Sequence, residues 1–136
     1  MTRILILLFL ILPQTACATA KVNLVGTWIM VSHQTVTVID YKKNGSFSGT
    51  YFTPRFDIKT TFVGKWNISR DELILDYIES SSPVMKVPFQ DRNRIVSKDK
   101  NTILLITLPD GIQVEAKRVT FKERKEVFPD WEKTNK

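Results

Sequence analysis

The chain has 136 residues, enough for one domain with a hydrophobic core and too few for two. Aromatic residues make up 10% of it, and it has only five glycines and six prolines, which argues against a disordered or low-complexity chain. The net charge of +6 leaves anionic partners open as a class.

Residues 1–20 have the organisation of a secretory signal peptide. Arg3 precedes an uninterrupted apolar run from Ile4 to Leu12, Pro13 ends that run, and alanines follow at positions 16, 18 and 20. The run is too short to span a bilayer as a stable anchor, so we expect export to the periplasm or the cell exterior. Removing the leader takes away one basic residue and lowers the net charge to about +5.

The single cysteine, Cys17, lies at the end of this leader. Thr15-Ala16-Cys17 resembles the end of a bacterial lipobox, whose cysteine becomes lipid-modified, but Gln14 stands where Leu, Val or Ile is usual. Two outcomes are open. Cleavage after position 18 or 20 releases a soluble protein without disulfides, whereas lipidation of Cys17 anchors an outer-membrane lipoprotein.

Two strands and a hairpin are predicted at the start of the mature domain. Gly26-Thr27-Trp28 opens the first strand, and the β-branched stretch from Val36 to Tyr41 forms the second. Asn44-Gly45 is the strongest hairpin signal, because both residues readily take the positive φ angles of a type I′ turn. The next strand carries Phe47 and Tyr51 on one face, and Pro54 marks a corner.

The longest regular pattern is a strict alternation over residues 56–68. Every second residue is mostly large and apolar, and the residues between are mostly charged or polar. The first set is Phe56, Ile58, Thr60, Phe62, Gly64, Trp66 and Ile68. Because successive side chains of a strand point to opposite faces, this segment predicts a long strand with one buried face. Gly64 leaves room there for a neighbour or a bend.

Short strands and turns continue to residue 121. Strands are expected over 72–79, 102–108 and 112–121, with turns at 69–71, 99–101 and 109–111. Met85, Val87 and Phe89 alternate around a proline and indicate an edge or irregular strand, and Ile95-Val96 indicates another. The apolar parity changes late in the last strand, which predicts a bulge near Lys117-Arg118. Residues 122–136 form a charged tail.

Eight or nine sequential antiparallel strands predict an all-β sandwich or barrel. Closure into a barrel removes exposed edges, so we expect an antiparallel up-and-down barrel of about eight strands over residues 21–121. No helix is predicted in the chain's C-terminal part.

Several short motifs carry a family resemblance. They are Gly26-Thr27-Trp28, a basic Lys117 or Arg118 on the last strand, Asn44-Gly45-Ser46-Phe47, Gly64-Lys65-Trp66-Asn67-Ile68 and Asp71-Glu72-Leu73-Ile74-Leu75. In these motifs the chain resembles the lipocalin-like (calycin) barrels, especially bacterial lipocalin-like domains of exported proteins. The resemblance implies that Trp28 lies across the barrel bottom under the basic side chain, with Gly26 as part of the motif.

Catalysis, metals and cofactors find little support in the sequence. His33 is the only histidine, and no partner cysteine or histidine accompanies it in the mature domain. No nucleophile elbow, phosphate loop or dinucleotide fingerprint occurs. We expect a protein that is not an enzyme and uses no cofactor or metal.

The basic charge and the aromatics also raise the question of nucleic acid. The aromatics lie mainly on the apolar parity of the strands, and export removes most nucleic acid from reach. We therefore expect no nucleic-acid partner. Contact with a membrane is expected only through a lipid anchor.

Two functions remain open. In the first, the barrel binds a small apolar or amphipathic ligand, and each interior ring either contacts that ligand or simply fills the core. The ligand-binding candidates are Phe47, Tyr51, Phe62, Trp66, Tyr77 and Arg118, with Trp28 also inside the barrel. In the second, the barrel is a scaffold that docks to an envelope protein as an accessory protein or inhibitor. It would dock through the Tyr51–Arg55 corner or through the tail, unless the tail covers one barrel end.

Overall fold

A computed structural model describes residues 22–32, 34–97 and 99–127 of the chain. The predictions for the leader, Cys17, His33 and the tail beyond residue 127 fall outside these residues.

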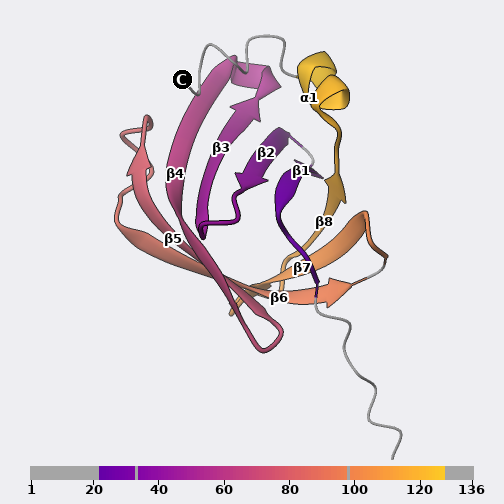
Figure 1. Ribbon diagram of the computed structural model, residues 1–136. Coiled ribbons are helices and arrows are strands. Elements are labelled where there is room, and N and C mark those ends of the chain that lie inside the picture. The colour runs from indigo at the N-terminus through magenta and orange to yellow at the C-terminus, as the bar shows by residue number, and fades with distance from the viewer. Residues whose placement is uncertain (1–21, 33, 98, 128–136) are drawn as a thin grey trace, which may run out of the picture.

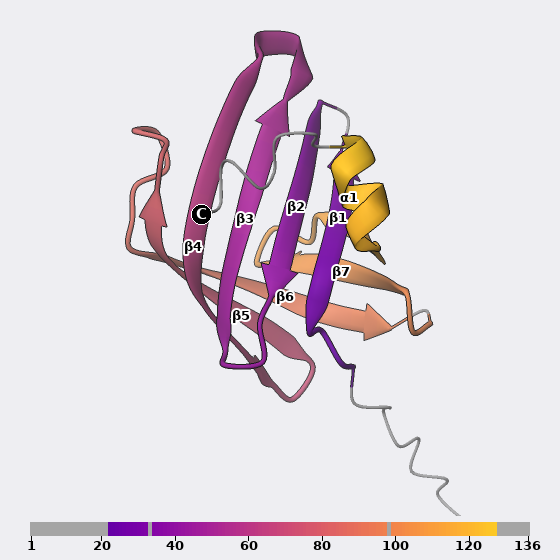
Figure 2. The ribbon, with the colours of Figure 1, turned by 45° about the horizontal axis from the view of Figure 1, so that its top comes forward.

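Eight antiparallel strands form one closed barrel in the described chain (Figures 1 and 2). Each strand pairs with its neighbours in the sequence, and β1 also pairs with β8. The strands are β1 (Gly26–Ser32), β2 (Thr35–Tyr41), β3 (Ser46–Thr53), β4 (Ile58–Ser69), β5 (Glu72–Ser80), β6 (Phe89–Ser97), β7 (Thr102–Leu108) and β8 (Gln113–Arg118). The predicted all-β up-and-down barrel is thereby confirmed.

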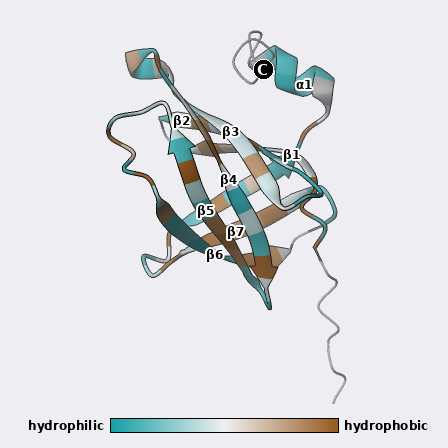
Figure 3. Cartoon of the chain, turned by 60° about the vertical axis from the view of Figure 1, so that its left-hand side comes forward, coloured by the Kyte–Doolittle hydropathy of each residue, from teal (hydrophilic) through white to brown (hydrophobic). Residues whose placement is uncertain are grey.

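The alternation predicted for the long central strand is present along most of β4. Thr60 and Phe62 are buried inside the barrel, and Trp66 and Ile68 are half-buried. Hydrophobic and hydrophilic bands alternate along the barrel wall in the same way (Figure 3). The start of the prediction is wrong, because Phe56 lies in a short 3₁₀ turn, η1 (Pro54–Phe56), and both Phe56 and Ile58 are exposed. At this end the strand extends beyond the packed interior.

Gly64 is required by its neighbours inside the barrel. A Cβ atom there would lie 2.6 Å from Cζ of Phe47 and 2.1 Å from the carbonyl oxygen of Asp76. The register between β4 and β5 also shifts between Val63 and Gly64. The missing side chain therefore makes room for the Phe47 ring at a bulge in the wall.

The predicted bulge near Lys117-Arg118 is wrong. β8 keeps a continuous register with β1 through these residues, with Arg118 opposite Trp28. The parity changes because the strand ends at Arg118, not at Phe121.

A helix, α1 (Phe121–Val127), follows β8 and lies outside the barrel (Figure 1). The prediction of a strand up to residue 121 without a helix after it is therefore wrong. Thr120 and Glu123 form a capping box: the Thr120 amide donates to the Glu123 carboxylate at 2.6 Å, and the Glu123 amide donates to the Thr120 hydroxyl at 3.3 Å. These bonds satisfy backbone donors at the helix start.

The β2–β3 hairpin lies where it was predicted but has another turn type. Gly45 has a φ of 80°, whereas Asn44 has no positive φ, so the turn is not type I′. The Gly45 amide donates to the Lys42 carbonyl, and the Lys42 amide donates to the Ser46 carbonyl. Asn44 instead accepts hydrogen bonds from the Ser46 amide and hydroxyl through its side-chain oxygen.

The meander gives the barrel two unlike ends. The closed end contains the β2–β3, β4–β5 and β6–β7 connections, and the chain enters there before β1. The mouth contains the β1–β2, β3–β4, β5–β6 and β7–β8 connections. The residues of the closed end that are almost completely buried are Leu24, Trp28, Leu73, Ile103 and Ala116.

Candidate ligand cavity

At the closed end, Trp28 contacts both the entering chain and Arg118. Its indole Nε1 donates to the carbonyl of Leu24 at 2.8 Å, and the Arg118 guanidinium lies over the ring, 4.5 Å from its centroid. Arg118 also donates to the carbonyls of Val25, at 2.6 Å, and Asn23. A cation stacked on a ring and bonded to the entering backbone holds that segment across the barrel bottom. This is the arrangement that the lipocalin resemblance implies.

Gly26 is part of the same arrangement. Its φ is 126°, and a Cβ atom there would lie 2.7 Å from a terminal nitrogen of Arg118. Only glycine adopts this conformation without strain and admits the guanidinium at this distance.

A cluster of rings fills the middle of the barrel. Phe47 lies with its ring centroid 5.1 Å from that of Tyr77 and 6.2 Å from that of Phe62, both edge-on. Tyr41 contacts Phe47 on one side and Trp66 on the other, the latter at 5.5 Å. Edge-to-face packing of this kind stabilises a core beyond the area it buries. The cluster is continuous with the packed residues of the closed end, and Tyr41, Phe62 and Tyr77 also border the cavity.

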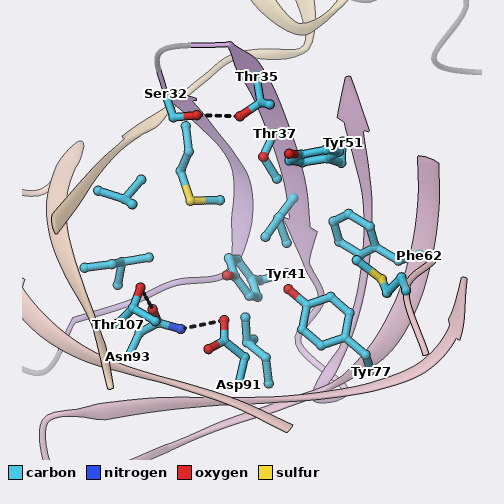
Figure 4. A pocket seen from close by; sticks show the side chains of 16 residues that line it. Ser32, Thr35, Thr37, Tyr41, Tyr51, Phe62, Tyr77, Asp91, Asn93 and Thr107 are labelled. Carbon is cyan, nitrogen blue, oxygen red and sulfur yellow. Dashed lines mark hydrogen bonds between the residues drawn. The ribbon is translucent and has the colours of Figure 1, made fainter. Parts of the chain in front are cut away.

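Above these rings, a cavity of about 290 Å³ occupies the half of the barrel next to the mouth (Figure 4). Its volume is at the small end of the range for ligand pockets. All eight strands contribute to the lining, which combines apolar side chains with a smaller number of polar ones. The described lining is Met30, Ser32, Thr35, Thr37, Ile39, Tyr41, Tyr51, Phe62, Leu75, Tyr77, Met85, Asp91, Asn93, Leu105, Thr107 and Val114.

One wall of the cavity carries three polar side chains that are linked by hydrogen bonds. The Thr107 hydroxyl donates to Oδ1 of Asn93 at 3.2 Å, and Nδ2 of Asn93 donates to Oδ2 of Asp91 at 3.1 Å. Asn93 is buried, and the chain of bonds fixes its amide orientation. β6 can place both Asp91 and Asn93 inside because they are two residues apart.

Two tyrosine hydroxyls face the same space as Asp91 (Figure 4). Burial raises the pKa of Tyr41 well above its usual value, and the charges of Tyr77 and Asp91 raise it further. Burial also raises the pKa of Tyr77, again with a contribution from Asp91. Both hydroxyls therefore stay protonated at physiological pH and are available as hydrogen-bond donors.

The mouth combines fixed loops with exposed apolar side chains. The Ser32 and Thr35 hydroxyls are hydrogen-bonded across the β1–β2 connection. The β5–β6 loop, which contributes Met85, is tied to β4 because the Thr61 amide donates to the Ser81 hydroxyl at 2.8 Å. The most exposed large hydrophobic residues of the described chain all lie near this end: Val31, Phe56, Ile58, Val84 and Ile112.

The structure divides the residues predicted to bind a ligand into two groups. Tyr51, Phe62 and Tyr77 line the cavity, and their contact with a ligand stays a prediction. The other three lie elsewhere: Phe47 is buried in the ring cluster, and Trp66 donates from Nε1 to the Lys42 carbonyl near the closed end. Arg118 covers Trp28, outside the described lining of the cavity.

Sequence reasoning missed the polar wall. Gln90 to Arg94 contains no apolar residue and therefore lacks the alternation that indicates a strand, although β6 runs through it. A signal was present: Phe89, Asp91, Asn93 and Ile95 share one parity, and Arg92 and Arg94 share the other. The two arginines form ion pairs on the outer face with acids near the start of β5, Arg92 with Glu72 and Arg94 with Asp71.

No protein-family model matches the chain, and no curated protein is significantly similar to it. Within the described residues, no group of His, Cys, Asp and Glu side chains is arranged to hold a metal ion. Among the same residues, no helix has both the length and the apolar character that a membrane span requires.

Proposed function

We propose that the protein is an exported, non-enzymatic, lipocalin-like binding protein that holds a small amphipathic ligand in the mouth half of its barrel. The observation that carries this proposal is the division of the interior. Aromatic side chains fill one part, while a cavity of about 290 Å³ remains in the other. A concave, mostly apolar space with a few converging polar groups is the usual form of a small-molecule site.

The cavity suits a ligand with an apolar body and one polar end. Phe62, Leu75 and Leu105 offer apolar contacts, whereas the Asp91–Asn93–Thr107 wall and the tyrosine hydroxyls offer polar ones. Burying polar protein groups against an apolar ligand without partners would cost free energy. An amphipathic ligand avoids that cost.

A fluorescence titration with N-phenyl-1-naphthylamine, a neutral probe that brightens in apolar sites, tests the proposal. We expect saturable binding to the wild-type protein and at least an approximately tenfold loss of affinity in Val114→Phe, which fills the cavity. Gln113→Phe is the matched control, since the neighbouring residue is exposed. Absence of saturable binding, or equal loss in both variants, would contradict a cavity site.

Docking to an envelope protein is the second candidate, and the exposed apolar side chains at the mouth favour it. In this case replacing Phe56 and Val84 with Ser should remove a co-purifying protein without changing probe binding. Recovery of the same partner by this variant would argue against docking at the mouth.

Export is part of the proposal, and the mature protein is either soluble or anchored by a lipid on Cys17. Mass spectrometry of the mature protein distinguishes the alternatives, because cleavage after position 18 or 20 leaves an unmodified N-terminus, whereas lipidation adds acyl mass at Cys17. An intact leader on the accumulated protein would contradict both.

A further inference from the structure

The charge inside the cavity is opposite to the charge of the whole protein. The chain has a net charge of +6, yet no Lys, Arg or His occurs among the described residues of the cavity lining. Asp91 is the one carboxylate in that lining. A ligand in this space would therefore meet a single negative charge at close range, whereas the many basic residues lie elsewhere.

The carboxylate is held in place by its own strand and by the next one. Oδ2 of Asp91 accepts the hydrogen bond from Asn93, and Asn93 is fixed in turn by the Thr107 hydroxyl on β7. In the close-up, the carboxylate faces the space between Tyr41 and Tyr77 (Figure 4). A carboxylate has acceptor positions for more than one donor, so Asp91 can receive a further hydrogen bond from a ligand.

Aromatic rings from β2 to β5 border one side of the same space. Tyr41, Tyr51, Phe62 and Tyr77 all contribute to the described lining. A ring face attracts a cation through its quadrupole, and a carboxylate attracts it through charge and hydrogen bonding. An anionic ligand such as a fatty acid would be buried next to Asp91 without a basic partner, which is unfavourable.

We propose that the cavity selects small cationic amphiphiles, with the ammonium group on Asp91 and the apolar body among Phe62, Leu75 and Leu105. The inference rests on the proposed ligand-binding function and adds the chemical class of the ligand. A primary amine with a single aromatic ring matches the small volume, the rings and the lone carboxylate.

A series of three ligands with the same phenethyl body tests the inference by calorimetric titration of the mature wild-type protein. Phenethylamine is cationic at neutral pH, phenethyl alcohol is neutral, and hydrocinnamate is anionic. We expect the amine to bind at least about tenfold more tightly than the alcohol, and the carboxylate to bind most weakly.

The variant Asp91→Asn removes the charge and keeps the shape. It should reduce the affinity for phenethylamine at least about tenfold and change the affinity for phenethyl alcohol by less than about threefold. Asp76→Asn is the matched control, because Asp76 lies on the outer parity of β5 and accepts a hydrogen bond from Gln90. It should leave both affinities unchanged.

The outcomes separate the two proposals. If the alcohol and the neutral naphthylamine probe bind but the amine has no advantage, or if Asp76→Asn acts as strongly as Asp91→Asn, ligand binding stands and the cation preference is wrong. If no ligand binds, both proposals fail. If Asp91→Asn does not fold, the wild-type series alone decides, since it needs no variant.

Discussion

The two halves of the barrel use the same strands for different purposes. At the closed end, Trp28 is 1% exposed and its ring and ring nitrogen both have partners. Near the mouth, the same strands carry Met30, Thr37 and Thr107 around a cavity. Packing density and satisfied polar groups stabilise a fold, whereas unfilled space and free hydrogen-bonding capacity are what a ligand needs. We infer that the closed end supplies the stability that the mouth half lacks.

Of the changes that test this difference between the two halves, Trp28→Ala should lower the free energy of unfolding most. Trp28→Ala removes a fully buried ring, its hydrogen bond to Leu24 and the surface on which Arg118 stacks. We expect a loss of about 4 kcal/mol in the free energy of unfolding, measured by urea denaturation. Trp66→Ala should cost less because Trp66 is only half-buried. Equal losses at both positions would contradict the claim that Trp28 contributes more to stability than Trp66.

Gly26→Ala should have the next largest effect, at the same end. The new Cβ meets the Arg118 guanidinium, and alanine is strained at a φ of 126°. We expect a loss of about 2 kcal/mol in the free energy of unfolding. Part of that loss should disappear when Arg118 is also replaced by Ala, because the collision is then absent. Full additivity in this double-mutant cycle would show that the two residues do not interact as described.

The smallest expected effect concerns α1. Hydrogen bonds from the Thr120 amide and hydroxyl lower the pKa of Glu123. A lowered folded-state pKa means that this contribution is present above the ordinary Glu pKa and is lost as the pH falls through the folded value. The protection of the α1 amides, which is the ratio of the intrinsic to the observed exchange rate, should therefore fall on acidification. Glu123→Gln should weaken this additional pH dependence, and an unchanged pH profile in that variant would contradict the assignment.

The fold was predictable because its signals are local and repeated. The period-two alternation of β4 and the glycine-tryptophan motif of β1 each indicate a strand that must be buried on one face. The errors occur where polar side chains decide the structure. Thr120-x-x-Glu123 is a recognisable capping box, yet the apolar Val119 and Phe121 suggested a continuing strand.

The candidate site was predictable only in its aromatic part. Tyr51, Phe62 and Tyr77 follow from strand parity, but parity does not tell which inward rings pack together and which border a space. Asp91 and Asn93 are hard to predict because a carboxylate that faces a barrel interior is rare, so a polar run is interpreted as a solvated loop. Their inward orientation depends on pairing between β5, β6 and β7, which lies beyond local sequence signals.

Amide NMR during a titration with phenethylamine tests the division of the barrel most directly. We predict chemical-shift changes concentrated at Thr37, Tyr77, Asp91 and Leu105, with little change at Leu24, Trp28, Leu73 and Ala116. Saturating changes centred on the closed-end residues, or no saturating change in the mouth half, would contradict the account.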